Sequence, residues 1–137
     1  MNHLPRDWDI FPDRLCPQFL EGIKCMVEHG LTNSTVDYSI IIPVYCNEGS
    51  LKDLYQTIQT DVVQQNISNS HEMIFIDDGS TDASFSVLLE LKQQDPKHVK
   101  IIKFTRNFGQ VAAILAGYQH AKGDCIVNIS ADLQDPP

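Results

Sequence analysis

The sequence predicts an α/β fold in which a mostly parallel sheet carries helices on both faces. From residue 38 onward, four short apolar runs alternate with longer segments of helical period, and this order is typical of parallel sheets packed against helices. The apolar runs are rich in Ile, Val or Phe and lack strict polar alternation, as expected for strands covered on both faces. The predicted strands are 39–44, 72–76, 99–104 and 125–129.

Three helices are predicted between these strands. The first, 50–65, begins at Ser50 as a candidate N-cap, the second spans 82–94, and the third spans 110–122 and ends at Gly123. The apolar residues expected to face inward from the first two are Leu51, Leu54, Ile58, Val62, Phe85, Leu88 and Leu91. The small residues expected to let the third helix approach the sheet closely are Ala112, Ala113, Ala116 and Gly117.

Residues 1–37 break this alternation and are predicted to be a helical extension of a domain that spans 38–137. Pro17 is suited to the first turn of a helix whose apolar residues form one stripe ending near Gly30. This helix is expected to cover an exposed edge or face of the domain. Docking on a partner protein or a membrane surface is the alternative.

Composition limits the partners and the compartment. Acidic residues outnumber basic ones by 18 to 10, and the formal net charge is -8, so nucleic acid is not an expected partner. There is no run of 18 apolar residues and no signal-peptide pattern at the N-terminus. The four cysteines form no CxxC pair and are expected to be reduced thiols of a soluble, cytoplasmic protein, with a disulfide framework as the alternative.

Polar segments follow all four predicted strands, namely 43–50, 77–82, 105–110 and 130–135. In an open parallel sheet, ligands bind outside the carboxyl ends of the strands. We therefore expect these four segments to line one cleft.

The first two segments have the chemistry of a nucleoside pocket. Tyr45 offers an aromatic face for a nucleobase, and Glu48 or a carboxylate of Asp77 or Asp78 can accept hydrogen bonds from an imide N–H or a ribose hydroxyl. The alternative is that 78–80 is an ordinary turn followed by Asp82 as a helix cap.

The last two segments suit a metal-bound phosphate. Arg106 precedes a predicted helix N-terminus and is placed to meet an anion; an ordinary surface salt bridge is the alternative. Asp132, Gln134 and Asp135 supply oxygen ligands, which favour Mg²⁺ or Mn²⁺ shared with phosphate oxygens. Their alternative is a loop of solvated carboxylates. The five scattered histidines and the lack of a glycine-rich phosphate loop argue against zinc, dinucleotide and P-loop sites.

Four ordered segments resemble a known family: IIIPVY at 40–45, IDDGSTD at 76–82, RNFG at 106–109 and ADLQDP at 131–136. They look like the nucleotide-sugar-binding half of an inverting family 2 glycosyltransferase, which has a Rossmann-like fold called GT-A. The last two segments are most similar to the dolichyl- and polyprenyl-phosphate glycosyltransferases.

The resemblance implies inverting transfer of a sugar from a UDP-sugar or GDP-mannose to a lipid-linked phosphate in cell-envelope biosynthesis, with Mg²⁺ or Mn²⁺ on the diphosphate. Substrate-binding positions carried over by motif are Pro43, Tyr45, Glu48, Asp77, Asp78, Arg106 and Asp132, and metal-binding positions are Asp132 and Gln134. Family members place acceptor-side catalytic residues beyond the position of Pro137, so the sheet is expected to be incomplete after its fourth strand and this chain to bind donor without turnover. The full-length protein is expected at the cytoplasmic face of the membrane.

Two positions depart from the family pattern. Ser130 stands where the family usually has the first carboxylate of an Asp-x-Asp element, so metal binding is expected to be weaker or to lean on Asp132, Gln134 and the substrate diphosphate. Residues 45–48 differ from the usual Tyr-Asn-Glu-Glu order. A saccharide acceptor and a non-catalytic nucleotide-binding module stay open as alternatives. An exposed strand edge is expected to favour self-association into a homo-oligomer.

Overall fold

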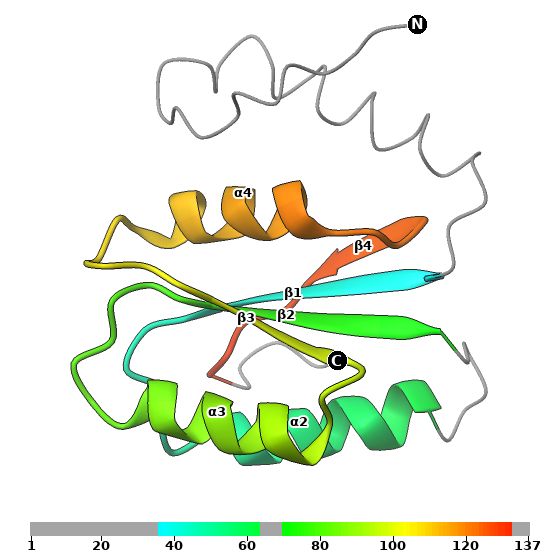
Figure 1. The fold of residues 1–137 in the computed structure, drawn as a ribbon, viewed down its shortest axis with the longest axis horizontal. Helices are drawn as coiled ribbons and strands as arrows, with labels where there is room; N and C mark the ends of the chain where they lie inside the picture. The colour runs from blue at the N-terminus through cyan, green and yellow to red at the C-terminus, as the bar shows by residue number, and fades with distance from the viewer. Residues whose placement is uncertain (1–35, 64–69, 133–137) are drawn as a thin grey trace, which may run out of the picture.

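The computed structural model describes residues 36–63 and 70–132, which form a four-stranded, all-parallel sheet in the order β3-β2-β1-β4. The strands are β1 (Tyr38–Val44), β2 (His71–Asp77), β3 (Val99–Lys103) and β4 (Cys125–Asn128). Figure 1 shows β1 and β2 in the middle of the sheet. The predicted parallel sheet is confirmed, and each strand end lies within one residue of its predicted position.

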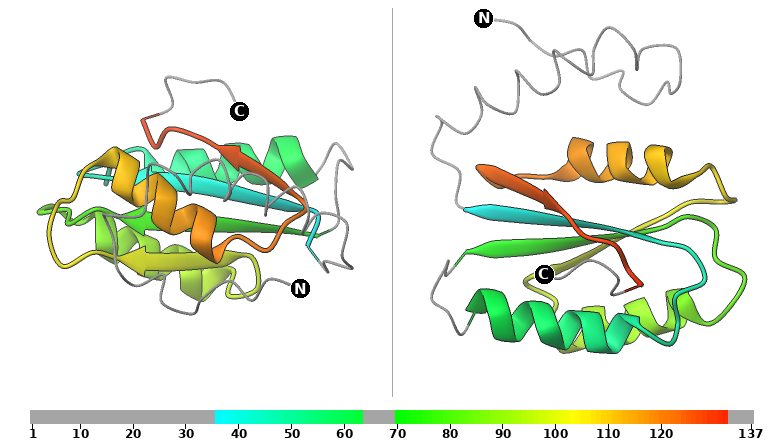
Figure 2. Two further views of the ribbon diagram at one scale, coloured as in Figure 1. Left: turned by 90° about the horizontal axis from the view of Figure 1, so that it is seen from above. Right: turned by 180° about the vertical axis from the view of Figure 1, so that it is seen from behind.

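Three α-helices cover the two faces of the sheet. Helix α4 (Gln110–His120) lies on one face, and α2 (Leu51–Ile58) and α3 (Ser84–Gln94) lie side by side on the other, as Figure 2 shows from two further directions. The Rossmann-like arrangement with helices on both faces is therefore confirmed. The helix predicted within residues 1–37 lies outside the described residues.

The first predicted helix, 50–65, differs most from the structure. Its α-helical part ends at Ile58 and continues as a π-helical turn over Gln59–Val63, and residues 64–69 lie outside the described part of the chain. The apolar period of 50–65 shows that the segment is helical but does not distinguish the wider hydrogen bonding of a π turn from that of an α-helix. The predicted inward residues Leu51, Leu54 and Ile58 are fully buried.

Alternation along the inner strands divides the core into two layers. In β1, Ile40 and Ile42 pack toward α2 and α3, whereas Ile41 packs toward α4. Of the residues predicted to face inward from α3, Leu88 and Leu91 are buried. Phe85 is only half-buried, and the Lys103 ammonium lies 3.8 Å from its ring centroid, so Phe85 is a cover for the β3 edge rather than a core residue.

Small residues bring α4 close to the sheet, as the sequence predicts. Ala113, Ala116 and Gly117 are buried. A Cβ atom added at Gly117 would lie 2.5 Å from Ile41 Cγ2 and 3.0 Å from Ile76 Cδ1. The separation between α4 and the sheet therefore depends on the absence of a side chain at this position.

A buried carboxylate anchors the end of the sheet where the strands begin. Glu72 is 2% exposed and accepts hydrogen bonds from the Ser39 hydroxyl (2.5 Å), the Lys122 amide (2.6 Å) and the Lys100 ammonium. The Gly123 amide in turn donates to Ser39 Oγ at 2.7 Å. These bonds join three strands to the turn that follows α4.

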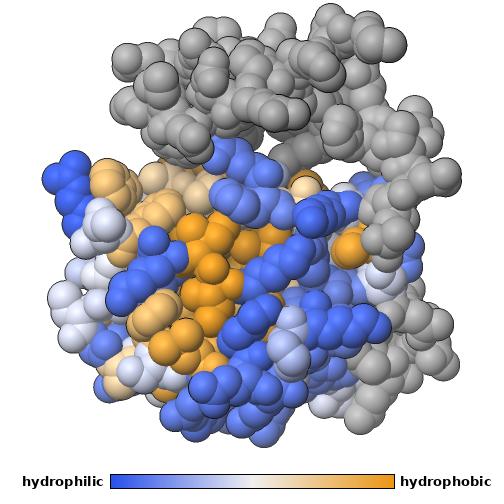
Figure 3. All heavy atoms as spheres, viewed as in Figure 1, coloured by the Kyte–Doolittle hydropathy of each residue, from blue (hydrophilic) through white to orange (hydrophobic). Residues whose placement is uncertain are grey.

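The view in Figure 3 faces the β3 edge of the sheet. Apolar side chains gather in the middle of this face, between the helical layers, and hydrophilic side chains flank them. Within the described strands, β3 pairs only with β2, and β3 carries the half-buried Ile101 and Ile102. The helices found in residues 36–63 and 70–132 all lack the length and apolar character of a membrane-spanning segment.

We predict that Gly117→Ala destabilises the fold. Alanine is favoured over glycine within a helix by about 1 kcal/mol, but forcing its Cβ against the buried Ile41 is expected to cost about 1–3 kcal/mol. The net loss should be near 1 kcal/mol, measured by urea denaturation. Gly49→Ala is the control, because a Cβ at Gly49 meets no atom within 4 Å. Equal or higher stability of the Gly117 variant would contradict the close approach of α4.

We also predict that the Glu72 network makes stability depend on pH. Burial opposes ionisation of Glu72, but hydrogen bonds from Lys100, Ser39 and the Lys122 amide outweigh it and hold the pKa below its ordinary value of 4.5. A depressed folded-state pKa stabilises the fold above that ordinary value, and the contribution is lost as the pH falls through the folded-state pKa.

The corresponding variant is Glu72→Gln, expected to lower the free energy of unfolding by about 2 kcal/mol at pH 7. The difference from the wild type should shrink below pH 4.5 in urea titrations at several pH values. Glu90→Gln serves as the control, because the Glu90–Lys52 pair has side chains 53% and 56% exposed and should change stability by less than about 0.5 kcal/mol. A Glu72 effect that is independent of pH would exclude this role.

Candidate functional site

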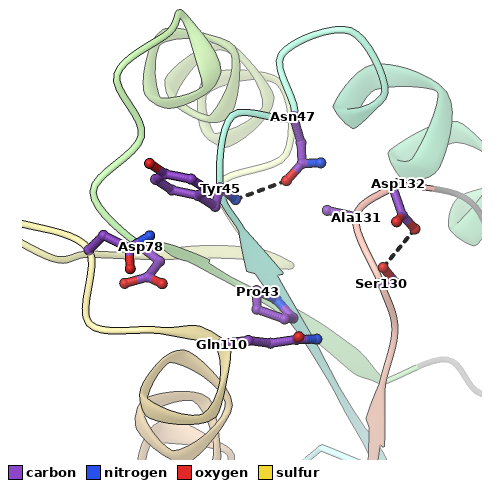
Figure 4. Close-up of a pocket in the computed structure, with 9 residues that line it drawn as sticks. Pro43, Tyr45, Asn47, Asp78, Gln110, Ser130, Ala131 and Asp132 are labelled. Atoms are coloured by element: carbon purple, nitrogen blue, oxygen red, sulfur yellow. Dashed lines mark hydrogen bonds between the residues drawn. The ribbon is translucent and has the colours of Figure 1, made fainter.

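A pocket of about 270 Å³ opens at the carboxyl ends of the strands. All four strand ends contribute to it, as the sequence predicts for a single cleft. Figure 4 shows the lining side chains around β1 and the segment that follows β4. The lining residues are Pro43, Tyr45, Asn47, Asp78, Asn107, Gln110, Ser130, Ala131 and Asp132.

The segment after β1 is held in place by a side chain of its own, by the segment after β2 and by the first residue of α3. Asn47 Oδ1 accepts a hydrogen bond from the Tyr45 amide at 2.8 Å, and the Asn47 amide donates to Ser84 Oγ at 2.8 Å. Cys46 has a left-handed φ of 54°, and its amide donates to Ser80 Oγ at 3.0 Å. These bonds hold the backbone of Tyr45, whose side chain remains 50% exposed at the pocket.

Glu48 is used at the start of α3 and is not a lining residue of the pocket. Its carboxylate accepts a hydrogen bond from the Ala83 amide at 2.9 Å, and Asp82 accepts from the Glu48 amide at 3.3 Å and the Ser84 amide at 3.0 Å. Burial opposes the charge on Asp82, but hydrogen bonds from Ser84 and the Glu48 amide outweigh it and lower the pKa of Asp82. Asp82 thus bonds Ser84, the first helical residue of α3, but the N-cap position is Ala83, which makes no side-chain capping bond. The expected start of this helix at 82, with Asp82 as its cap, is therefore wrong by one to two residues.

The two adjacent aspartates differ in position. Asp78 lines the pocket, and its two carboxylate oxygens accept hydrogen bonds from the Phe108 amide at 2.7 Å and the Gly109 amide at 3.0 Å. Asp77 is fully buried and accepts from the Ser80 amide at 3.0 Å. The second oxygen of Asp77 has no partner in the part of the chain that the structure describes.

Gly79 allows the segment after β2 to pack closely against the backbone of the segment after β3. Its φ is +70°, and an added Cβ would lie 2.4 Å from the carbonyl carbon of Arg106 and 2.5 Å from the amide nitrogen of Asn107. The Arg106 guanidinium lies 4.7 Å from the ring centroid of Phe108, and Arg106 is exposed and not a lining residue. The close contact explains why a glycine stands between Asp78 and Ser80.

The segment after β4 places two oxygen-bearing side chains together in the pocket. Ser130 Oγ donates a hydrogen bond to Asp132 Oδ1 at 2.7 Å, and Figure 4 shows the pair on one side of the pocket. Ser50, expected as the N-cap of α2, makes no side-chain capping bond. Its hydroxyl donates instead to the Ala131 carbonyl at 2.6 Å.

The oxygen donors fit a hard divalent cation better than zinc. A hydroxyl and a carboxylate are typical Mg²⁺ or Mn²⁺ ligands, and these ions commonly complete their coordination with substrate phosphates. Over 36–63 and 70–132, no group of three or more His, Cys, Asp or Glu side chains is arranged to hold a metal ion. Gln134 and Asp135 lie outside the described residues.

Sequence reasoning missed three neutral amides in the lining, Asn47, Asn107 and Gln110. All three lie in the polar segments after β1 and β3, in which the prediction used only charged, aromatic and proline side chains. Their amide groups both donate and accept hydrogen bonds, which was the available signal. Of the predicted substrate-binding residues, Pro43, Tyr45, Asp78 and Asp132 line the pocket, whereas Glu48, Asp77 and Arg106 do not.

Two curated proteins with similar sequences are named as transferases of sugars. The chain is 47% identical over 102 residues to the uncharacterized glycosyltransferase YkcC of Bacillus subtilis, covering 74% of this chain and 31% of that protein. It is 40% identical over 99 residues to the undecaprenyl-phosphate 4-deoxy-4-formamido-L-arabinose transferase of Salmonella choleraesuis, covering 72% and 30%. The chain thus spans less than a third of the length of these relatives.

Solved structures share the fold. The mannosyltransferase PcManGT from Pyrobaculum calidifontis, solved with GDP-Man and Mn²⁺, aligns with a TM-score of 0.61 at 19% identity, over 85% of this chain and 36% of that one. S. aureus TarS aligns with a TM-score of 0.60 at 20% identity, over 71% and 28%, and has also been solved with UDP. The family model described as Glycosyl transferase family 2 matches residues 39–137. With most of its length matched and its fold shared with glycosyltransferases of the GT-A type, the chain belongs to glycosyl transferase family 2.

Proposed function

We propose that this chain is the donor-binding part of an enzyme that transfers a sugar, with inversion, from a UDP-sugar or GDP-mannose to a polyprenyl or dolichyl phosphate. The observation that carries the proposal is the composition of one pocket, in which an exposed aromatic ring, a carboxylate and a hydroxyl–carboxylate pair come from different strand ends. These are the groups needed by a base, a ribose and a metal-bound diphosphate.

The nucleoside is proposed to lie between the segments that follow β1 and β2. Tyr45 supplies a face for stacking, and Pro43 supplies an apolar wall beside it. Each oxygen of Asp78 already accepts one backbone hydrogen bond, but a carboxylate has about four acceptor sites and can still accept an imide N–H or a hydroxyl. In this proposal, Glu48 and Asp77 support the pocket through the loops to which they are bonded.

The diphosphate is proposed to lie toward Ser130 and Asp132. Asp132 would hold the divalent cation with Gln134, and the Ser130 hydroxyl would add a neutral oxygen. A divalent cation held by these residues would supply positive charge to the leaving diphosphate and so favour displacement at the anomeric carbon. Because the protein supplies few charged ligands here, cation and nucleotide should bind together. Arg106, exposed before α4, is proposed to turn toward the same anion.

One relative supports the proposed acceptor class. The Salmonella relative is named for transfer involving undecaprenyl phosphate, and a phosphate acceptor is already anionic, so it needs little help from a general base. We place the acceptor-side groups, and membrane association at the cytoplasmic face, in the length of the relatives that this chain does not span. This chain alone is therefore proposed to bind donor without turnover.

We predict metal-dependent nucleotide binding that requires Asp132. Calorimetric titration with UDP and with GDP should show that Mn²⁺ raises the affinity for one of them, and Asp132→Asn should reduce that gain by about tenfold or more. Asp124→Asn is the matched control, because Asp124 is exposed and precedes β4 at the opposite end of the strand. Metal-independent binding that is unaffected by either substitution would exclude the proposed diphosphate site.

We further predict that Tyr45 contributes stacking that does not depend on the cation. Tyr45→Ala should weaken nucleotide binding by about 1–3 kcal/mol with and without Mn²⁺, because base stacking on an aromatic ring is worth about that much. Tyr45→Phe keeps the ring and should bind normally. Thermal stability should be unchanged in both variants, since the side chain is half exposed. Loss of affinity in the Phe variant would instead assign the role to the hydroxyl.

A further inference from the structure

Ser50 occupies the N-cap position of α2 but does not cap the helix. Its hydroxyl donates to the carbonyl of Ala131 at 2.6 Å, a residue 81 positions away in the sequence, and lies 3.3 Å from the Asn47 carbonyl. A hydroxyl carries one donor hydrogen, and the shorter contact is the stronger bond. The side chain is therefore committed to the segment after β4.

The Ala131 carbonyl is part of the peptide bond between Ala131 and Asp132, one residue after Ser130. A hydrogen bond to this carbonyl restricts rotation of the peptide plane between the two side chains that face the pocket. Packing already anchors this segment, because Ile129 and Ala131 are 8% and 3% exposed within the core. The hydroxyl thus adds orientation to a segment that is attached without it.

The same short loop also holds the nucleoside side of the pocket. The Ser50 amide donates to the Asn47 carbonyl at 3.1 Å, and the Asn47 side chain accepts from the Tyr45 amide at 2.8 Å. Two residues of this loop, Asn47 and Ser50, therefore link Tyr45 to the segment that carries Asp132. The loop thus makes hydrogen bonds toward both ends of the pocket.

We propose that Ser50 is a positioning residue that orients Asp132 and Ser130 for a divalent cation and links cation binding to the nucleoside loop. This inference rests on the proposed function, because it assumes a nucleotide–metal complex in the pocket. Residues that orient metal ligands through hydrogen bonds typically change metal affinity by about 10–100-fold when removed. Ser50 would act in this way through the backbone rather than through the side chain of a ligand.

Binding measurements test the positioning role with three variants. Ser50→Ala should reduce the Mn²⁺-dependent gain in nucleotide affinity by about tenfold, while metal-free affinity should change by less than about twofold. Ser50→Thr keeps the hydroxyl and should restore the gain. Thr57→Ala is the control, because the Thr57 hydroxyl donates to the Asp53 carbonyl within the same helix. Equal losses with and without Mn²⁺ would overturn the positioning role.

Hydrogen–deuterium exchange of the ligand-free protein supplies a second readout. In Ser50→Ala, the amides of residues 130–132 should exchange faster by about fivefold or more, and in Ser50→Thr and Thr57→Ala they should match the wild type. Unchanged exchange in Ser50→Ala would show that the hydroxyl does not hold the segment. A wild-type protein that binds neither nucleotide would overturn the proposed function, and the exchange data would then separately decide whether Ser50 orients this segment.

Discussion

Parallel pairing of β1 with both β2 and β4 is the constraint on which the rest of the molecule depends. Both neighbours of β1 run in the same direction as β1, so the carboxyl ends of the three strands meet at one edge of the sheet. Residues separated by more than 80 positions, such as Ser50 and Ala131, consequently become neighbours. The position of the pocket is therefore set by the common direction of the strands, and the side chains determine its chemistry.

The loops at that edge stabilise one another rather than being held individually. Gly79 packs against the backbone after β3, Asp78 bonds the amides that precede α4, and Glu48 bonds the start of α3. Each contact joins segments from two different strands. Mutual support of this kind keeps the site ordered before ligand arrives, which reduces the ordering cost of binding.

The sequence predicted the parts of this structure that depend on periodicity. Apolar runs predict buried strands, and apolar residues at helical spacing predict helices. These two patterns were enough to predict the sheet and the small-residue face of α4 near Gly117. The partners of individual hydrogen bonds could not be predicted from these patterns. Ser50 carries the usual mark of an N-cap, and only the tertiary arrangement shows that Ala131 competes successfully for its hydroxyl. Glu48 presented a similar ambiguity, because the end of a strand and the start of a distant helix both attract a carboxylate.

The Glu72 network and the pocket lie at opposite ends of the strands. Substitutions in the loops around the pocket therefore leave the Glu72 network at the other end of the strands unchanged. In a scaffold divided in this way, the loops can accept substitutions without loss of the interactions that hold the sheet together. Because all four strands run in one direction, the Glu72 network lies at one end of the sheet and the loops around the pocket lie at the other.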